Sequence, residues 1–114
     1  MPSNLSAGYL HVKGDVKTTP ILERHFNTPE MLTVLEGDAL MVCGLPKNGI
    51  SEITGLKAFY IKQGDVFCMA EGTWHYAPVP YGCEIAKFMV LFREGTEDQD
   101  MDVVNLDEEI EISL

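Results

Sequence analysis

The chain has 114 residues, which suits one domain, because two domains of half this length would each be too small to bury a stable core. Hydrophobic residues make up 46% of it, as in globular and not in disordered proteins. The formal net charge of −10, from 18 acidic and 8 basic residues, argues against nucleic acid and anionic membranes as partners, since both bind basic surfaces.

The apolar residues form short runs that are separated by turn-forming residues, and no segment keeps a helical period. In chain order, the predicted strands are 9–13, 21–26, 31–35, 39–45, 56–62, 66–69, 75–79 and 84–92. Turns with glycine separate several of them, as in Glu36-Gly37-Asp38 and Gln63-Gly64-Asp65. A last strand is predicted at 103–106, and residues 107–114 are read as either a helical turn or a frayed strand.

Eight or nine short strands predict an all-β fold. Their edges stay exposed unless a sheet closes or two sheets cover each other, so a double-sheet jelly-roll barrel is the favoured architecture. An immunoglobulin-like sandwich is disfavoured because the Cys–Trp–Cys pattern is absent. An OB-fold is disfavoured because its binding face is usually basic and this chain is acidic.

The cysteines indicate a reducing compartment. Cys43, Cys68 and Cys83 are odd in number and show no CxxC spacing, which argues against a disulfide framework or a zinc ribbon. We expect all three to be buried as small hydrophobic residues. The first residues contain no basic stretch leading into an apolar run, so no signal peptide is expected and the predicted location is the cytoplasm.

Acidic residues gather at the end of the chain. Nine of the 18 acids follow Arg93, and the simplest interpretation of residues 94–114 is a solvated, solubilising segment.

Four side chains form the candidate site. Glu23 and His25 are two residues apart on a predicted strand and therefore face the same side, and Glu30 precedes the next strand. His75 comes from far downstream, after a glycine turn. Together they would supply nitrogen and oxygen ligands for a divalent Zn, Mn, Fe or Ni ion, and no organic cofactor is expected.

The spacing of these residues resembles the two motifs of the cupin superfamily. The first motif, G-x5-H-x-H-x(3,4)-E-x6-G, is matched in its second half by Glu23-x-His25-x4-Glu30-x6-Gly37, with Glu23 at the first histidine position. The second, G-x5-P-x-G-x2-H-x3-N, is matched by Gly64-x5-Ala70-x-Gly72-x2-His75-x3-Val79, with Ala70 at the proline position and Val79 at the asparagine position. The resemblance implies a cupin-type double-stranded β-helix over residues 1–114.

Within the cupins, the chain resembles the ureidoglycolate lyases over roughly residues 21–110. The similar stretches are Leu22-Glu23-Arg24-His25, Glu36-Gly37-Asp38, Leu56-Lys57-Ala58-Phe59-Tyr60, Gly72-Thr73-Trp74-His75 and the acidic segment 98–106. These enzymes release urea from ureidoglycolate to give glyoxylate in purine breakdown. The resemblance implies Glu23 or Glu30 as the base, and His75 as the acid or a metal ligand beside His25.

Three further residues are candidates for binding the substrate. Lys87 could hold a carboxylate, although an exposed position on an edge strand is the alternative. Trp74 and Tyr76 could line the site, although packing is the alternative for both. Because the chain is acidic, an anionic substrate needs a local cation, which would be a metal, Lys87 or Arg24. Without one, a neutral ligand such as a sugar is the better fit.

Two other functions stay open at this point. The protein could be a non-catalytic cupin that binds a small sugar or carboxylate. It could also act only within an oligomer, and a homodimer is expected, with the apolar strands 31–35 or 88–92 at its interface.

Overall fold

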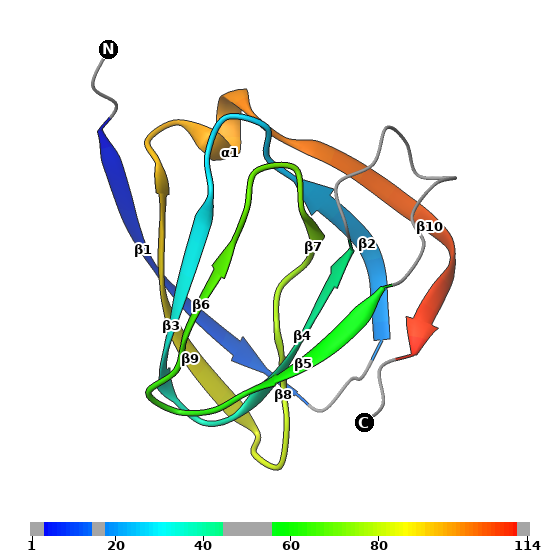
Figure 1. Cartoon of the computed structure of the whole chain (residues 1–114). Coiled ribbons are helices and arrows are strands. Elements are labelled where there is room, and N and C mark those ends of the chain that lie inside the picture. The colour runs from blue at the N-terminus through cyan, green and yellow to red at the C-terminus, as the bar shows by residue number, and fades with distance from the viewer. Residues whose placement is uncertain (1–3, 15–17, 45–55, 112–114) are drawn as a thin grey trace.

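The computed structural model describes residues 4–14, 18–44 and 56–111, and for residues 18–20, 97, 98 and 107–111 it describes the backbone only. Two antiparallel sheets face each other and enclose the core (Figure 1). The first sheet has the strand order β1 (Leu5–Lys13), β9 (Ile85–Arg93), β3 (Glu30–Glu36), β6 (Val66–Met69). No helix of the described residues is long and apolar enough to cross a membrane.

The second sheet has the order β10 (Asp102–Glu111), β2 (Thr18–Arg24), β7 (Trp74–His75), β4 (Ala39–Gly44), β5 (Lys57–Ile61), and β8 (Val79–Pro80) also pairs with β4. A short helix, α1 (Thr96–Gln99), precedes β10 and was not predicted. Neighbours in each sheet are mostly distant in sequence, so each strand depends on partners from elsewhere in the chain.

Alternating burial explains how the two sheets enclose one core. Along β1 the side chains alternate without exception between exposed and half-buried, because successive residues of a strand point to opposite faces. The inward residues of both sheets form the main cluster: Leu32, Val34, Ala39, Met41, Ile61, Met69, Ala86, Phe88 and Val90. A smaller cluster of Leu40, Val42 and Val79 lies on the other face of β4, which is why β4 is buried on both sides.

The strand predictions hold for type and order, with one correction. The predicted strand 75–79 is two separate pieces, β7 and β8, which both pair with β4. Pro78 and Pro80 have no N–H to donate, so a continuous ladder cannot pass through this segment.

Strand ends also differ from the prediction. β2 starts at Thr18 and ends at Arg24, before His25. It ends there because the N–H groups of Phe26 and Asn27 bond to the Asp100 side chain and not to a neighbouring strand. The end of the chain is a strand as far as Glu111, and Leu45, the last residue of predicted strand 39–45, lies outside the described residues.

Candidate metal and acid–base site

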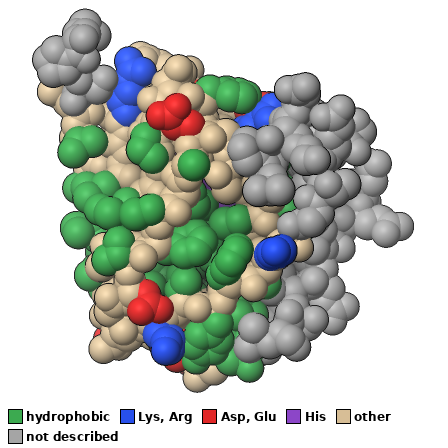
Figure 2. All heavy atoms as spheres, viewed as in Figure 1, with side chains coloured by type: hydrophobic (Ala, Val, Ile, Leu, Met, Phe, Trp, Pro, Cys, Tyr) green, Lys and Arg blue, Asp and Glu red, His purple; other side chains and the backbone are tan. Residues whose placement is uncertain are grey.

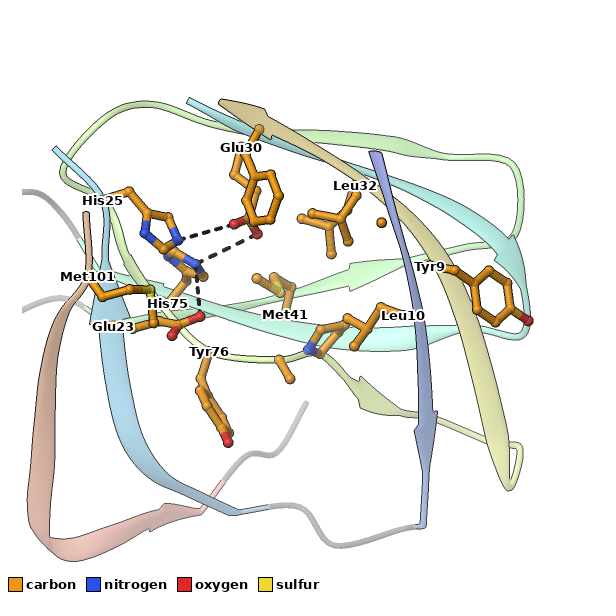
Figure 3. Close-up of a pocket in the computed structure, with 15 residues that line it drawn as sticks. Tyr9, Leu10, Glu23, His25, Glu30, Leu32, Met41, His75, Tyr76 and Met101 are labelled. Atoms are coloured by element: carbon orange, nitrogen blue, oxygen red, sulfur yellow. Dashed lines mark ion pairs between the residues drawn. The ribbon is translucent and has the colours of Figure 1, made fainter. Parts of the chain in front are cut away.

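The two sheets bring the four predicted site residues together (Figure 3). Glu23 on β2 is the direct cross-strand partner of His75 on β7. His25 follows the end of β2, and Glu30 is the first residue of β3 in the opposite sheet. The site therefore spans the gap between the sheets, and neither sheet could form it alone.

The polar atoms of this cluster lie within contact distance. His25 Nε2 is 3.2 Å from Glu30 Oε1. His75 Nε2 is 3.6 Å from Glu23 Oε1 and 3.7 Å from Glu30 Oε2. The two imidazole rings are 5.1 Å apart at 60°. Each carboxylate thus faces an imidazole, and Glu30 contacts both rings, one through each of its oxygens.

Backbone carbonyls fix the orientation of both imidazoles. Nδ1 of His25 lies 2.8 Å from the carbonyl oxygen of Asp100, and Nδ1 of His75 lies 2.9 Å from that of Thr73. A carbonyl oxygen can only accept a hydrogen bond, so each Nδ1 carries the proton. In the neutral ring, Nε2 is then left with a free lone pair that points toward the carboxylates.

Protonation of His25 is favoured by its surroundings. Burial is the largest single influence and lowers the pKa of His25. It is outweighed by the adjacent Glu30 carboxylate, the Asp100 carbonyl and the charge of Glu23, so the pKa is raised above the ordinary 6.5. In the absence of a metal, His25 is therefore ready to hold a proton on the nitrogen that faces Glu30.

The cluster fits a divalent metal ion. Both Nε2 atoms are buried, and neither has a partner with hydrogen-bond geometry among the described residues. Ligand atoms of Glu23, His25 and His75 lie within 4.8 Å of one another. Buried polar atoms normally have a partner, so two unsatisfied nitrogens aimed at one point suit a bound cation. Two imidazoles and a carboxylate are a donor set for Zn, Mn, Fe or Ni.

The cluster occupies one end of a cavity of about 230 Å³. Beside it lie Leu10, Leu32 and Met41, as Figure 3 shows. The remaining lining residues are Gly8, Tyr9, Tyr76, Ala77, Pro78, Val90, Phe92 and Met101. No lysine or arginine is among the described residues that line the cavity, so its charged side chains are confined to the cluster.

The three predicted substrate-binding residues lie in different places. Tyr76 lines the cavity. Trp74 is buried outside it, with the Arg24 guanidinium 4.2 Å from its ring centre. Lys87 also lies outside the cavity, with Nζ 2.9 Å from Glu36 Oε2. Its neighbours Ala86 and Phe88 are in the core, so strand alternation turns Lys87 outward. It lies on β9, a central strand, and not on an edge.

Asp100 was not predicted as part of the site. Its carboxylate accepts hydrogen bonds from the N–H groups of Phe26 (2.9 Å) and Asn27 (2.8 Å), and its carbonyl holds His25. It is only 9% exposed. The interpretation of residues 94–114 as a solvated segment is therefore wrong at this residue. Asp102, whose side chain is 37% exposed, pairs through Oδ2 with Arg24 Nε at 2.8 Å.

Comparison with known proteins identifies the family. Residues 5–113 match the profile of the family described as "Ureidoglycolate lyase". The chain belongs to the ureidoglycolate lyase family. A search of curated protein sequences finds no match.

Solved structures show that this member of the ureidoglycolate lyase family has a cupin fold. It superposes on peruvianin-I, a cysteine peptidase from Thevetia peruviana latex, with a TM-score of 0.64, 17% identity, and coverage of 90% of this chain and 56% of that chain. It superposes on hydroxypropylphosphonic acid epoxidase from S. wedmorenis with a TM-score of 0.58 and 21% identity, and the match covers 76% of this chain and 42% of that chain. For oxalate decarboxylase the TM-score is 0.61 and the identity 22%, and the match covers 91% of this chain and 24% of that chain.

The comparisons confirm the predicted cupin fold and the predicted family resemblance. The chain spans at most 56% of the length of these solved chains. At sequence identities near 20%, the similarity shows a shared fold and nothing about function.

Proposed function

We propose that the protein is a lyase that releases urea from ureidoglycolate and leaves glyoxylate. Family membership supports this reaction. The observation that carries it is the convergence of two imidazoles and two carboxylates at one end of a cavity. Acid–base chemistry at neutral pH needs such groups within reach of one reacting centre.

The reaction moves one proton and breaks one bond. A base removes the proton from the substrate hydroxyl, the oxygen forms a C=O double bond with its carbon, and the C–N bond to the ureido group breaks. The departing nitrogen takes a proton and leaves as urea. No oxidant or reductant is needed, so the reaction requires only a base, an acid and a way to hold the substrate carboxylate.

Glu30 is the best-placed base. Its carboxylate contacts both imidazoles and can pass a proton to His25, whose Nε2 is 3.2 Å away and whose pKa is raised. His25 in its protonated form can in turn supply the proton that the departing nitrogen needs. Glu30 is also the one acid of the cluster outside the set of three converging ligands, which leaves it available for this role.

Glu23, His25 and His75 would hold a divalent ion. When bound, such an ion supplies the positive charge that attracts a carboxylate and stabilises an alkoxide. This positive charge matters because no lysine or arginine is among the described residues that line the cavity, and because the chain has a net charge of −10. A residue that binds the ion cannot at the same moment carry a proton on the same nitrogen. In the loaded site His25 would therefore be a ligand, and Glu30 would give the proton that it has taken from the hydroxyl to the departing nitrogen.

The test is turnover of ureidoglycolate, followed through release of both urea and glyoxylate. Glu30→Gln keeps the size of the side chain and removes the base, so we expect turnover to fall at least about 100-fold. Glu71→Gln is the matched control, because Glu71 is exposed in a turn away from the cavity, and it should retain full activity. Full activity in Glu30→Gln would contradict the assignment of the base.

Elemental analysis of untagged protein tests the metal separately. Near-stoichiometric transition metal that is lost in His25→Ala and His75→Ala supports the three-ligand site. If the wild-type protein binds no metal on reconstitution and yet turns over, the ligand assignment is wrong and the four side chains act by acid–base chemistry alone. If ureidoglycolate stabilises the protein against heat and no product forms, the lyase proposal fails.

A further inference from the structure

Beyond the cluster of two imidazoles and two carboxylates, the described lining of the cavity is largely apolar. Leu32 and Met41 lie next to the cluster, and Leu10 follows beyond them, as Figure 3 shows. Leu32 and Met41 are each 1% exposed and belong to the main core. The same apolar lining continues with Pro78, Val90 and Phe92. The cavity thus has a charged end and an apolar end.

Two tyrosines also line the cavity, and both are turned away from the cluster. Tyr9 is 63% exposed, and Figure 3 shows its ring pointing away from the cluster. The hydroxyl group of Tyr76 also points away from the cluster in Figure 3. No other described lining residue outside the cluster has a nitrogen or an oxygen atom in its side chain. A polar group that lies beside Leu32 and Met41 therefore finds no side-chain nitrogen or oxygen to bond there.

Both ends of the cavity are shielded from solvent. His25 and His75 are 4% and 3% exposed, and almost no histidine is visible on the face of the molecule that Figure 2 shows. Leu32 and Met41 are buried in the same way. A polar group that leaves water for such a place without a hydrogen bond weakens binding, whereas an apolar group strengthens it. The apolar end therefore favours an apolar part of a substrate.

The reaction decides which part of a substrate reaches the apolar end. The hydroxyl must lie at the cluster, because Glu30 takes its proton. The carboxylate must lie there as well, because among the described lining residues only the cluster can provide positive charge, as a protonated imidazole or through an ion that it holds. The reacting carbon carries the hydroxyl, the carboxylate and the nitrogen. The group on the nitrogen therefore extends toward Leu10, Leu32 and Met41.

In ureidoglycolate, the group on the nitrogen ends in an NH₂ group, which the apolar end does not match. The bond cleavage does not require this NH₂ group. It requires the carbonyl next to the nitrogen, because that carbonyl makes the departing nitrogen an amide. An acyl group supplies the same carbonyl, and a methyl group in place of NH₂ keeps the shape and removes two unpaired N–H groups.

We infer that the same site releases carboxamides from N-acyl-α-hydroxyglycines that carry a short apolar acyl chain. The inference rests on the lyase reaction proposed above and extends it to a second class of substrate. Glu30 removes the hydroxyl proton, the C=O bond of glyoxylate forms, and the C–N bond breaks with its electron pair on nitrogen. The nitrogen takes up the proton, so R–CO–NH–CH(OH)–COO⁻ gives R–CO–NH₂ and glyoxylate.

The size of the cavity limits the length of the acyl chain. Its volume is about 230 Å³, whereas sites for drug-sized ligands have roughly 300–1,000 Å³. Chains of a few carbons fit this space, and long acyl chains or peptides do not.

Three substrates of the wild-type protein test the inference: ureidoglycolate, N-acetyl-α-hydroxyglycine and N-butyryl-α-hydroxyglycine. Release of glyoxylate and of the amide product is measured, and the rate without protein is subtracted. The acetyl compound has a methyl group where ureidoglycolate has NH₂, and its kcat/KM should be at least as high. Each buried CH₂ group strengthens binding roughly fourfold, so kcat/KM should be about 15-fold higher for the butyryl than for the acetyl compound. This gain should appear as a lower KM, because the chain is bound equally in the substrate and in the transition state.

A pair of variants tests the place where the chain binds. Leu10 and Val12 both lie on β1 and pack against the main core, but only Leu10 lines the cavity. Leu10→Phe adds volume at the apolar end, so the butyryl-to-acetyl ratio of kcat/KM should fall from about 15 to about 2 or less. Val12→Phe is the matched control and should keep the ratio of the wild type. If either variant fails to fold by circular dichroism, the three substrates of the wild type decide.

The outcomes separate this inference from the lyase proposal. Turnover of ureidoglycolate without turnover of the acyl compounds, or without a gain from acetyl to butyryl, would overturn the inference and leave the lyase proposal standing. An unchanged ratio in folded Leu10→Phe would also overturn it. Turnover of the butyryl compound but not of ureidoglycolate would support the inference and contradict ureidoglycolate as the substrate. If none of the three compounds is turned over, both proposals are wrong.

Discussion

Replacing Asp100 by Asn tests how a residue outside the cavity builds the site. The Asp100 carboxylate accepts two N–H groups at 2.9 and 2.8 Å, from Phe26 and Asn27. A hydrogen bond to a charged group contributes about 1.5–3 kcal/mol. The asparagine amide keeps one acceptor oxygen and turns an NH₂ group toward the second N–H. We therefore expect Asp100→Asn to lower the free energy of unfolding at pH 7 by about 2 kcal/mol.

The loss should depend on pH in a defined direction. Burial alone would raise the pKa of Asp100, but the N–H groups of Phe26 and Asn27 and the nearby His25 together lower it. A carboxylate with a lowered pKa stabilises the folded state above its pKa in the unfolded chain, about 3.9, and that stabilisation disappears as the pH falls through the folded-state pKa. Wild type and Asp100→Asn should therefore differ in urea unfolding at pH 7, and the difference should shrink as the pH falls below about 3.9 and the carboxyl takes up a proton.

The same substitution should weaken metal binding. The carbonyl of Asp100 orients His25, and partners that orient a ligand typically change metal affinity by about 10–100-fold. Because the substituted carboxylate acts on this carbonyl indirectly, we expect about a tenfold loss, measured by competition of Zn²⁺ with a chelator.

Asp102→Asn is the matched control. It removes the ion pair with Arg24, but the Asp102 side chain is 37% exposed, so the pair contributes at most about 1 kcal/mol. Asp102 bonds none of residues 25–27 in the contacts described, and its substitution should leave the Zn²⁺ affinity unchanged. An equal loss of stability in both variants, or a loss in Asp100→Asn that does not change with pH, would refute the reasoning.

Two further predictions concern the turns and the thiols. Gly37→Ala should lower the free energy of unfolding by more than about 2 kcal/mol, because φ is +79° and a Cβ would lie 2.6 Å from the Ile85 carbonyl oxygen. Gly64 has a φ of +93° but open space around it, so Gly64→Ala should lower the free energy of unfolding by only about 1 kcal/mol. Urea unfolding measures both changes. Cys68 is exposed and should react with a thiol reagent in the native protein. Burial and the charge of Glu30 raise the pKa of Cys43 to about 12, so Cys43 should react only after unfolding. Equal reaction rates of the two thiols in the native protein would contradict this prediction.

The cysteines already correct one expectation. Cys43 and Cys83 are half-buried, but Cys68 is exposed, because it occupies the outward side of β6 between the inward residues Phe67 and Met69. A short run of alternating pattern does not by itself say which of its faces meets the core.

Much of the fold and part of the site follow from local sequence. Apolar runs with period two and glycine turns predict the strands, because side-chain direction alternates with each residue. The same rule predicts that Glu23 and His25 share a face. Their spacing to Glu30, and the glycine spacing before His75, pointed to the four residues that the structure gathers in one cluster.

Tertiary structure decided the rest, because those features join residues far apart in the chain. Asp100 reaches His25 across 75 residues, and nothing local distinguishes it from the acids around it. The outward position of Lys87 depends on which side of β9 faces the core. The sequence by itself determined that the fold is an all-β cupin fold and that the site contains imidazoles and carboxylates. Only the packing of two sheets decided which of these side chains face one another, since a strand's pattern fixes its two faces but not its partners.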